Sequence, residues 1–279
     1  MIDIHLYHPR PDSGCRSIET SESADFPIPL PLSDNLRQNF RVLEFSRKAE
    51  VRLLPEMTDD AICLVRRGRV RLLARFPTAH EGCRNMLTDI LPPGGVFGQP
   101  RHWRLQAIRE TAIAAEGTEI WAIAASRLEQ LLARLPGAAA FFCRMLDRQI
   151  FRQKQRRVHV TALDVPARLA ATLLEMAEQF GVQNPSGQGI RLSGISQQDM
   201  ADLIGASRSF VSTLINMMKL EGFLIGIGRS IVISRSDKLE QLAEGRTRLL
   251  ALSSLRAKPQ QEPPPPRPLR VRLGFEPRR

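Results

Sequence analysis

The side chains with the clearest chemistry lie between Gln197 and Asn216, in a segment that fits a helix-turn-helix. Ala201 is small where two helices would cross, and Gly205 stands where the turn needs a positive φ. Ser207 can cap the second helix. Apolar residues recur at helical spacing on the side that would join the helices: Met200, Leu203, Ile204, Val211, Leu214 and Ile215. A helical hairpin without DNA contact is the competing interpretation.

The polar side of the second helix suits base reading. It carries donors and short hydroxyls near the helix N-terminus, the end that a recognition helix presents to the major groove. The β-type runs at 223–225 and 230–233 predict a wing, in which Arg229 lies beside glycines and can contact phosphates. A capping hairpin is the alternative for the wing. The candidate DNA-binding residues are Gln197, Ser207, Arg208, Ser209, Ser212, Thr213 and Arg229.

The charge of the chain favours a polyanionic partner. Its 279 residues give room for about two domains and carry a net charge of +11. Residues 256–279 hold seven Lys or Arg and two Asp or Glu, or +5, which leaves +6 on the rest. This Pro-rich tail cannot fold alone. It either adds sequence-independent DNA affinity or is inert.

Cysteine usage fits a reducing cytoplasm, because no C-x-x-C or zinc-finger spacing occurs and no metal site is predicted. Cys63 and Cys143 lie in apolar segments and are expected to be small core residues. His80 and Cys83 share a predicted hairpin loop; solvated side chains are favoured there over haem or metal ligands. No signal peptide or stretch of 18 uncharged apolar residues is present, so neither export nor membrane insertion is expected.

Changes in sequence pattern predict the organisation of the chain. Residues 1–35 suit a loose arm, and from about 40 to 125 short alternating runs predict a β-roll. Residues 138–160 contain neither Gly nor Pro and predict a long helix. One stripe of it suits a partner helix from a second subunit, with packing on its own roll as the alternative: Phe142, Met145, Leu146, Gln149, Ile150 and Gln153. Asp164 opens a further helix over 165–180, and a loop over 181–189 leads to the helix-turn-helix.

This order of elements resembles the Crp/Fnr superfamily of bacterial transcription regulators over about residues 40–240. The resemblance is carried by residues 91–98, 163–170 and 195–220. It implies an α+β fold with a cyclic-nucleotide-binding-like roll. The expected boundaries are a flexible arm at 1–35, an effector-sensing β-roll at 36–136, a dimerisation helix at 137–163, a winged helix-turn-helix at 164–240, and a helical end with a disordered basic tail at 241–279.

The resemblance also implies a cytoplasmic, sequence-specific regulator. Its partners would be double-stranded DNA, a second copy of the chain and RNA polymerase, with no membrane. A homodimer would hold a two-fold symmetric operator with half-sites about 34 Å apart. Many members read Ser-Arg-Glu-Thr-Val-Ser-Arg along the recognition helix. Here Arg208 matches, but Ser209 and Thr213 replace the Glu and the second Arg, so the operator should differ.

The effector pocket departs from the pattern of cyclic-nucleotide-binding members. They follow Phe-Gly with a Glu and later carry an Arg-Ser or Arg-Thr pair, whereas Gln99 follows here and Ile108-Arg109 stands at the later pair. Cyclic AMP is therefore disfavoured, no cofactor is predicted, and a 2-oxoglutarate-type effector or none stays open. The pocket candidates are Phe97, Gly98, Gln99, Arg109, Gln153 and Lys154.

The motifs of common enzymes are missing from the sequence. It shows no nucleophile elbow, no phosphate-cradling loop and no H-E-x-x-H, so no enzymatic activity is expected. The alternative function is an effector-sensing module that acts through a protein partner while its helix-turn-helix is silent. A sequence-specific footprint on DNA separates the two.

Overall fold

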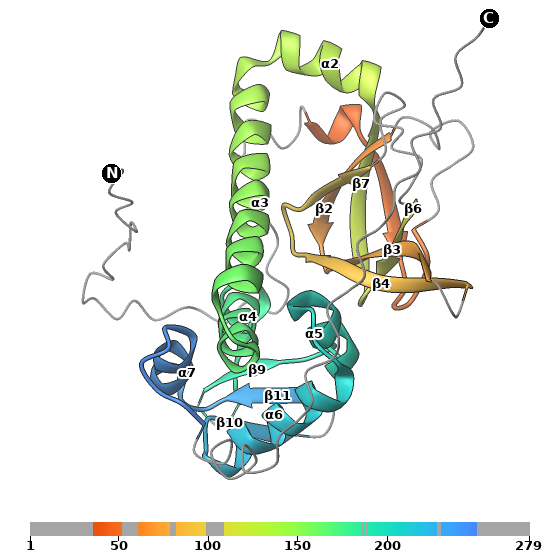
Figure 1. Ribbon diagram of the computed structural model, residues 1–279. Coiled ribbons are helices and arrows are strands. Elements are labelled where there is room, and N and C mark those ends of the chain that lie inside the picture. The colour runs from red at the N-terminus through yellow and green to blue at the C-terminus, as the bar shows by residue number, and fades with distance from the viewer. Residues whose placement is uncertain are drawn as a thin grey trace, which may run out of the picture.

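A computed structural model describes residues 36–51, 61–78, 82–98, 109–185, 187, 189–227 and 230–249. The described elements form a β-roll, a long helix beside it and a smaller domain at one end of that helix (Figure 1). The expected α+β class is confirmed. The expected arm at 1–35 and the Pro-rich tail lie outside the described residues. No helix among the described residues is long and apolar enough to cross a membrane.

The β-roll consists of two antiparallel sheets. One has the strand order β1-β7-β2-β5 and the other β4-β3-β6. Alternation in the second sheet follows the expectation, because Val70, Leu72 and Ala74 are buried. Burial raises the pKa of the Cys63 thiol to about 12, in keeping with a core residue. The strands are β1 Arg41–Phe45, β2 Ala61–Arg67, β3 Val70–Thr78, β4 Gly82–Leu91, β5 Val96–Gly98, β6 Arg109–Ala114 and β7 Thr118–Ala124.

Two helices follow the roll, α2 at Ala125–Arg134 and α3 at Pro136–Ala162. One side of α3 packs on its own roll. Phe142 stacks on Phe40 with ring centroids 6.2 Å apart, and Met145 lies in the same core cluster. The side-chain amide of Gln149 exchanges two hydrogen bonds of 3.0 Å with the backbone of Val96. The first part of the expected stripe therefore belongs to the roll.

The rest of that stripe lies on another side of α3. Leu146 and Ile150 each follow a roll-facing residue by one position, which turns them about 100° away, and both are exposed. The spacing predicts a single stripe, but in the structure one part of it packs on the roll and the other part is exposed. Cys143 is exposed as well, so its expected place in the core is wrong.

The smaller domain surrounds the helix-turn-helix with a four-stranded sheet of order β10-β11-β9-β8. The segment 181–189 is predicted to be a loop, but it contains the short strand β8, and the short strand β9 follows it directly. Both strands extend the sheet. The elements are α4 Val165–Phe180, β8 Val182–Gln183, β9 Ile190–Leu192, α5 Gln197–Ile204, α6 Arg208–Leu220, β10 Leu224–Ile227, β11 Ser230–Ile233 and α7 Ser236–Ala243.

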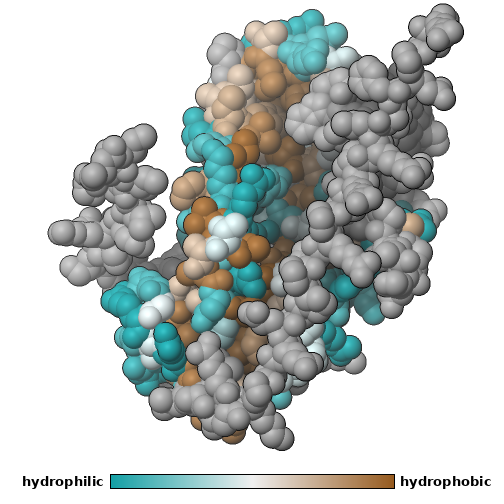
Figure 2. Space-filling model, in the orientation of Figure 1, coloured by the Kyte–Doolittle hydropathy of each residue, from teal (hydrophilic) through white to brown (hydrophobic). Residues whose placement is uncertain are grey.

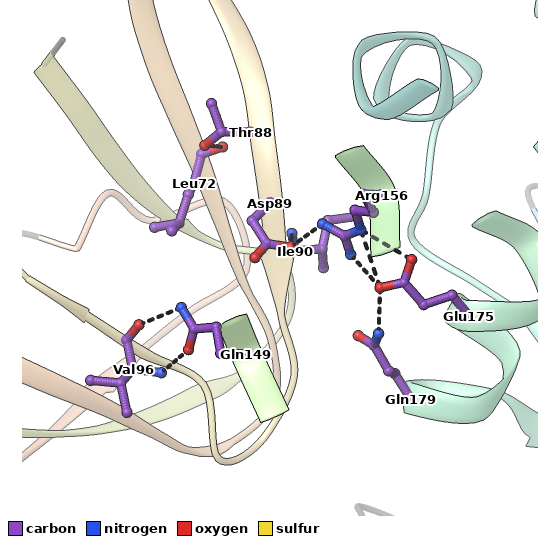
Figure 3. Close-up of polar contacts among 9 residues, drawn as sticks. All are labelled: Leu72, Thr88, Asp89, Ile90, Val96, Gln149, Arg156, Glu175 and Gln179. Atoms are coloured by element: carbon purple, nitrogen blue, oxygen red, sulfur yellow. Dashed lines mark hydrogen bonds and ion pairs between the residues drawn. The ribbon is translucent and has the colours of Figure 1, made fainter. Parts of the chain in front are cut away.

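Arg156 of α3 joins the roll to this domain (Figure 3). Its guanidinium binds Asp89 of β4 at 2.5 Å and Glu175 of α4 at 2.8 Å. Gln179 donates to the same Glu175 carboxylate at 2.8 Å. Burial alone would lower the pKa of Arg156, but the two carboxylates raise it above its usual value. The cation therefore stays charged between the buried Asp89 and the half-buried Glu175.

The first helix of the helix-turn-helix also rests on the roll. Asp199 of α5 forms an ion pair with Arg71, and Asp202 accepts from Arg84 at 3.3 Å and from the backbone N–H of Leu87 at 3.1 Å. Leu87 and Ile90 of β4 belong to the same buried cluster as the helix-turn-helix. Roll and smaller domain thus share one core.

Arg156 permits a direct test of this junction. The change Arg156→Met keeps the aliphatic stem but leaves Asp89 and Glu175 without their cation, so we expect a loss of roughly 3–5 kcal/mol in the free energy of unfolding. Urea unfolding followed by circular dichroism measures it. Arg157→Met, at an exposed neighbour, should change stability by less than about 0.5 kcal/mol. Equal losses in the two variants would contradict the bridge.

Candidate nucleic-acid interface

Local sequence fixes both ends of α5. The helix begins with a capping box, in which the Asp199 N–H donates to Ser196 Oγ at 3.1 Å and the Ser196 N–H donates to the Asp199 carboxylate at 2.9 Å. It ends at Gly205, whose φ of 63° lies in the left-handed region. This is the turn conformation that the sequence predicted.

The two helices cross at a residue without a bulky side chain. Ala201 is completely buried, and Val211, Leu214 and Ile215 of α6 are buried in the same cluster. Close helix packing at Ala201 fixes the angle of α6 to α5. Figure 1 shows α6 at the end of the molecule remote from the roll, with α5 between them. The second helix is thus held by its inner face and is free on its outer face.

The outer face of α6 carries the expected polar residues. Ser207, Arg208, Ser209 and Thr213 are exposed, and Ser212 is half-buried. The hydroxyls of Ser207 and Ser209 lie 3.1 Å apart, and Ser207 also caps the helix by accepting from the Phe210 N–H at 3.3 Å.

Thr213 is engaged with its own helix as well. Its hydroxyl donates to the Ser209 carbonyl at 3.1 Å. Local bonds thus hold the hydroxyls of Ser207, Ser209 and Thr213, although each oxygen keeps the capacity to accept.

Of the remaining parts of the predicted interface, the structure describes Gln197 and the wing strands but not Arg229. Gln197 is half-buried at the first position of α5. Strands β10 and β11 pair from Leu224 opposite Ile233 to Ile227 opposite Ser230, as a wing requires. Arg229, at the tip between them, lies outside the described residues. Its role as a phosphate contact stays a prediction.

Sequence reasoning missed two exposed polar residues on α6, Asn216 and Lys219. The Lys219 side chain runs across the wing strand β10, because a Cβ on Gly226 would lie 3.0 Å from its ammonium. The signal for Asn216 was its spacing of four from Ser212 and seven from Ser209 on the same helix. Base reading was expected only from the first turns of that helix.

The effector-pocket candidates do not come together in the described residues. Phe97 packs beside the roll core, and Gly98 has a φ of 146° with Ala61 O only 2.1 Å from the position of a Cβ. Glycine is therefore needed there for the backbone approach of β5 to β2. Gln99 and the Arg109 side chain lie outside the description, although the Arg109 backbone begins β6 opposite Arg75.

Residues of α3 other than the expected pair contact the roll. Gln153 and Lys154 are exposed, whereas Gln149 binds β5 as described (Figure 3). Arg152 is half-buried, burial lowers its pKa, and its Nε has no hydrogen-bond partner among the described residues. The roll-facing polar side chains of α3 are therefore Gln149, Arg152 and Arg156.

Comparison with known proteins finds the same architecture elsewhere. Residues 167–242 match the family model of the Crp-like helix-turn-helix domain. A CRP-like cAMP-activated global transcriptional regulator of Mycobacterium tuberculosis is 29% identical over 66% of this chain and 80% of its own length. The cAMP-activated global transcriptional regulator CRP of Haemophilus influenzae is 26% identical over 54% of this chain and 66% of its own.

Solved structures show the likeness in fold. A CooA mutant from Carboxydothermus hydrogenoformans aligns with a TM-score of 0.60 at 22% identity, over 80% of this chain and 98% of its own. A transcriptional regulator of the CRP family from Thermus thermophilus aligns with 0.57 at 23% identity, over 75% and 99%. The order of roll, long helix and helix-turn-helix domain is thus common to these proteins.

Gly205 allows the turn geometry to be tested. A Cβ there meets no atom within 4 Å, so Gly205→Ala adds only backbone strain and should lower the free energy of unfolding by about 1–2 kcal/mol. Gly137→Ala, inside α3 and equally open, should raise stability by about 0.5–1 kcal/mol. Urea unfolding measures both. Changes of the same sign would show that the turn does not need the left-handed conformation.

Proposed function

We propose that this chain, which belongs to the Crp/Fnr superfamily of transcription regulators, binds a two-fold symmetric DNA site as a homodimer and regulates transcription there. The observation that carries the proposal is the outer face of α6. A complete core holds this helix in a helix-turn-helix, while its polar side chains remain exposed. That arrangement suits insertion into the major groove.

The N-terminal turns of α6 supply the proposed base contacts. Arg208 is exposed at the first position, from which a guanidinium can donate two hydrogen bonds to O6 and N7 of guanine. Ser209, Ser212 and Thr213 follow on the same face as weaker readers. Outside the bases, we propose phosphate contacts for Gln197, Ser207 and Arg229.

The exposed side of α3 supports the homodimer. Large apolar side chains gather there, and Figure 2 shows hydrophobic surface along this part of the molecule. Four of them are between 43% and 59% exposed, namely Leu146, Ile150, Phe151 and Val158. Together they form a broad apolar stripe that covers about 140° of the helix circumference, and such a surface favours burial against another subunit. Two copies joined along α3 would place their α6 helices in successive major grooves, with half-sites about 34 Å apart.

The proposed effector region comprises the roll and the side of α3 that faces it. Two of the similar regulators are named as cAMP-activated. This chain carries Gln99 and Ile108 where cyclic-nucleotide binders carry an acid and a basic residue, so we propose an effector other than cAMP, or none. The half-buried Arg152 would favour an anion.

The remaining parts of the proposal follow from the regulator function. The chain acts in the cytoplasm by binding rather than by catalysis, and RNA polymerase is its protein partner at the promoter. Contacts between α5 and the roll then link any effector to DNA, because the ion pairs of Asp199 and Asp202 cross that boundary.

Arg208→Ala tests the DNA-reading face. We expect binding to a selected operator to weaken about 5- to 150-fold, because a bidentate guanine contact is lost, while binding to random DNA changes little. Competition gel shifts measure both. Arg134→Ala, an exposed arginine at the end of α2, is the matched control and should preserve operator binding. Unchanged selectivity of Arg208→Ala would remove this residue from the site.

Ile150→Glu tests the dimer. A charge in the apolar stripe should convert the chain to a monomer in sedimentation-velocity runs, since a buried carboxylate without a partner opposes association. Gln130→Glu adds the same charge at an exposed position of α2, away from this stripe, and should leave the dimer intact. A dimer of equal affinity in both variants would place the interface elsewhere.

A further inference from the structure

One polar residue on the outer face of α6 has no role in the interface described so far. Asn216 is exposed between the buried pairs Leu214-Ile215 and Met217-Met218. At 3.6 residues per turn it falls near the middle of the outer face, one turn beyond Ser212 and two beyond Ser209. Asn216 thus lies on the same helix face as the proposed base-reading residues.

Several polar neighbours of Asn216 on this face are already engaged, whereas Asn216 is not. The hydroxyls of Ser207, Ser209 and Thr213 are held by bonds within their own helix. Lys219 lies against Gly226 of the wing, where an ammonium suits a phosphate. Among the described residues, the Asn216 amide makes no hydrogen bond with any side chain or backbone group. It therefore offers a donor and an acceptor together to whatever faces α6.

Helix stability does not account for this residue. Asparagine is a weaker helix former than alanine, because its amide competes for backbone hydrogen bonds. Its usual places are caps and turns, whereas Asn216 stands in the ninth position of a 13-residue helix. The local structure thus gains nothing from an amide at this position.

The chemistry of the amide matches one base. In the major groove only adenine presents an acceptor at N7 beside a donor at N6, and an asparagine side chain can bond both. We infer that Asn216 reads an adenine in each half-site, an assignment that rests on the proposed function. The contact extends base reading one helical turn beyond the residues at the N-terminus of α6.

The helix geometry sets the spacing of this contact. Asn216 follows Arg208 by eight residues, or about 12 Å along the axis at 1.5 Å per residue. Base pairs rise about 3.4 Å each. For a helix that follows the groove, the adenine should therefore lie about three to four base pairs from the guanine that Arg208 reads.

The test compares sites selected from random DNA by the full-length wild type and by Asn216→Ala, each with and without cAMP. We expect both proteins to select the same guanine, and the variant alone to lose preference for one adenine about three to four base pairs away. At that position the wild type should discriminate about 5- to 150-fold. Asn216→Asp should prefer cytosine there, because a carboxylate accepts from cytosine N4 but cannot donate to adenine N7.

A base analogue separates direct contact from an indirect effect. Replacing the selected adenine by 7-deazaadenine removes the N7 acceptor, so it should weaken the wild type and leave Asn216→Ala unaffected. Lys219→Gln serves as the control, because it should weaken binding to every sequence alike and keep the adenine preference.

The possible failures are distinct. If the wild type selects a motif and Asn216→Ala selects the same motif with equal preference at every position, the inference is overturned while the regulator function stands. A 7-deazaadenine penalty that persists in Asn216→Ala overturns it as well. If the wild type selects no motif with or without cAMP, the proposed function and this inference fall together.

Discussion

The ion pairs of the half-buried Arg156 guanidinium are the interaction on which the arrangement of the molecule depends. Arg156 lies on α3, yet its two carboxylate partners belong to β4 of the roll and α4 of the smaller domain. A charge buried between two elements is costly unless both partners are in place. The bridge thereby fixes which side of α3 faces the roll. The apolar side with Leu146 and Ile150 is left exposed.

A second set of ion pairs decides which helix of the helix-turn-helix packs on the roll and which has an exposed face. Asp199 and Asp202 bind α5 to arginines of β3 and β4, and Leu87 and Ile90 complete the core beneath it. Helix α6 is fixed through α5 and lies at the end of the molecule remote from the roll (Figure 1). Its polar side chains Arg208, Ser209 and Thr213 are exposed. A displacement of the β3–β4 hairpin would change the partners of α5 directly. The fold thus connects the proposed effector region with the proposed DNA-reading helix through these charged contacts.

The sequence predicted best those features that short segments determine by themselves. The left-handed Gly205, the buried Ala201 and the cap at Ser207 each follow from local sterics, so the helix-turn-helix could be placed to the residue. The alternation in β3 likewise identified its buried face. Together these features were enough to predict the order of the domains and the fold class.

Tertiary contacts account for the rest. Arg71 and Asp199 are 128 positions apart, and no spacing rule connects them. The sequence predicts a single stripe on α3 because helical periodicity shows which residues share a face but not what that face contacts. Strands β8 and β9, of two and three residues, are too short to show a period and exist through pairing with each other and β11. The base-reading candidates were recognised by chemistry, but the engagement of Thr213 with Ser209 required the structure.

Selection of genomic DNA fragments by the purified full-length protein tests the central claim most directly. The experiment is run at near-physiological salt, without added ligand and then with cAMP or 2-oxoglutarate. A sequence-reading dimer predicts enrichment of a two-fold symmetric site whose half-sites are about one helical turn apart. Binding that is blind to sequence and fades steeply with salt under all three conditions would show contacts to phosphates alone. That result would contradict the account.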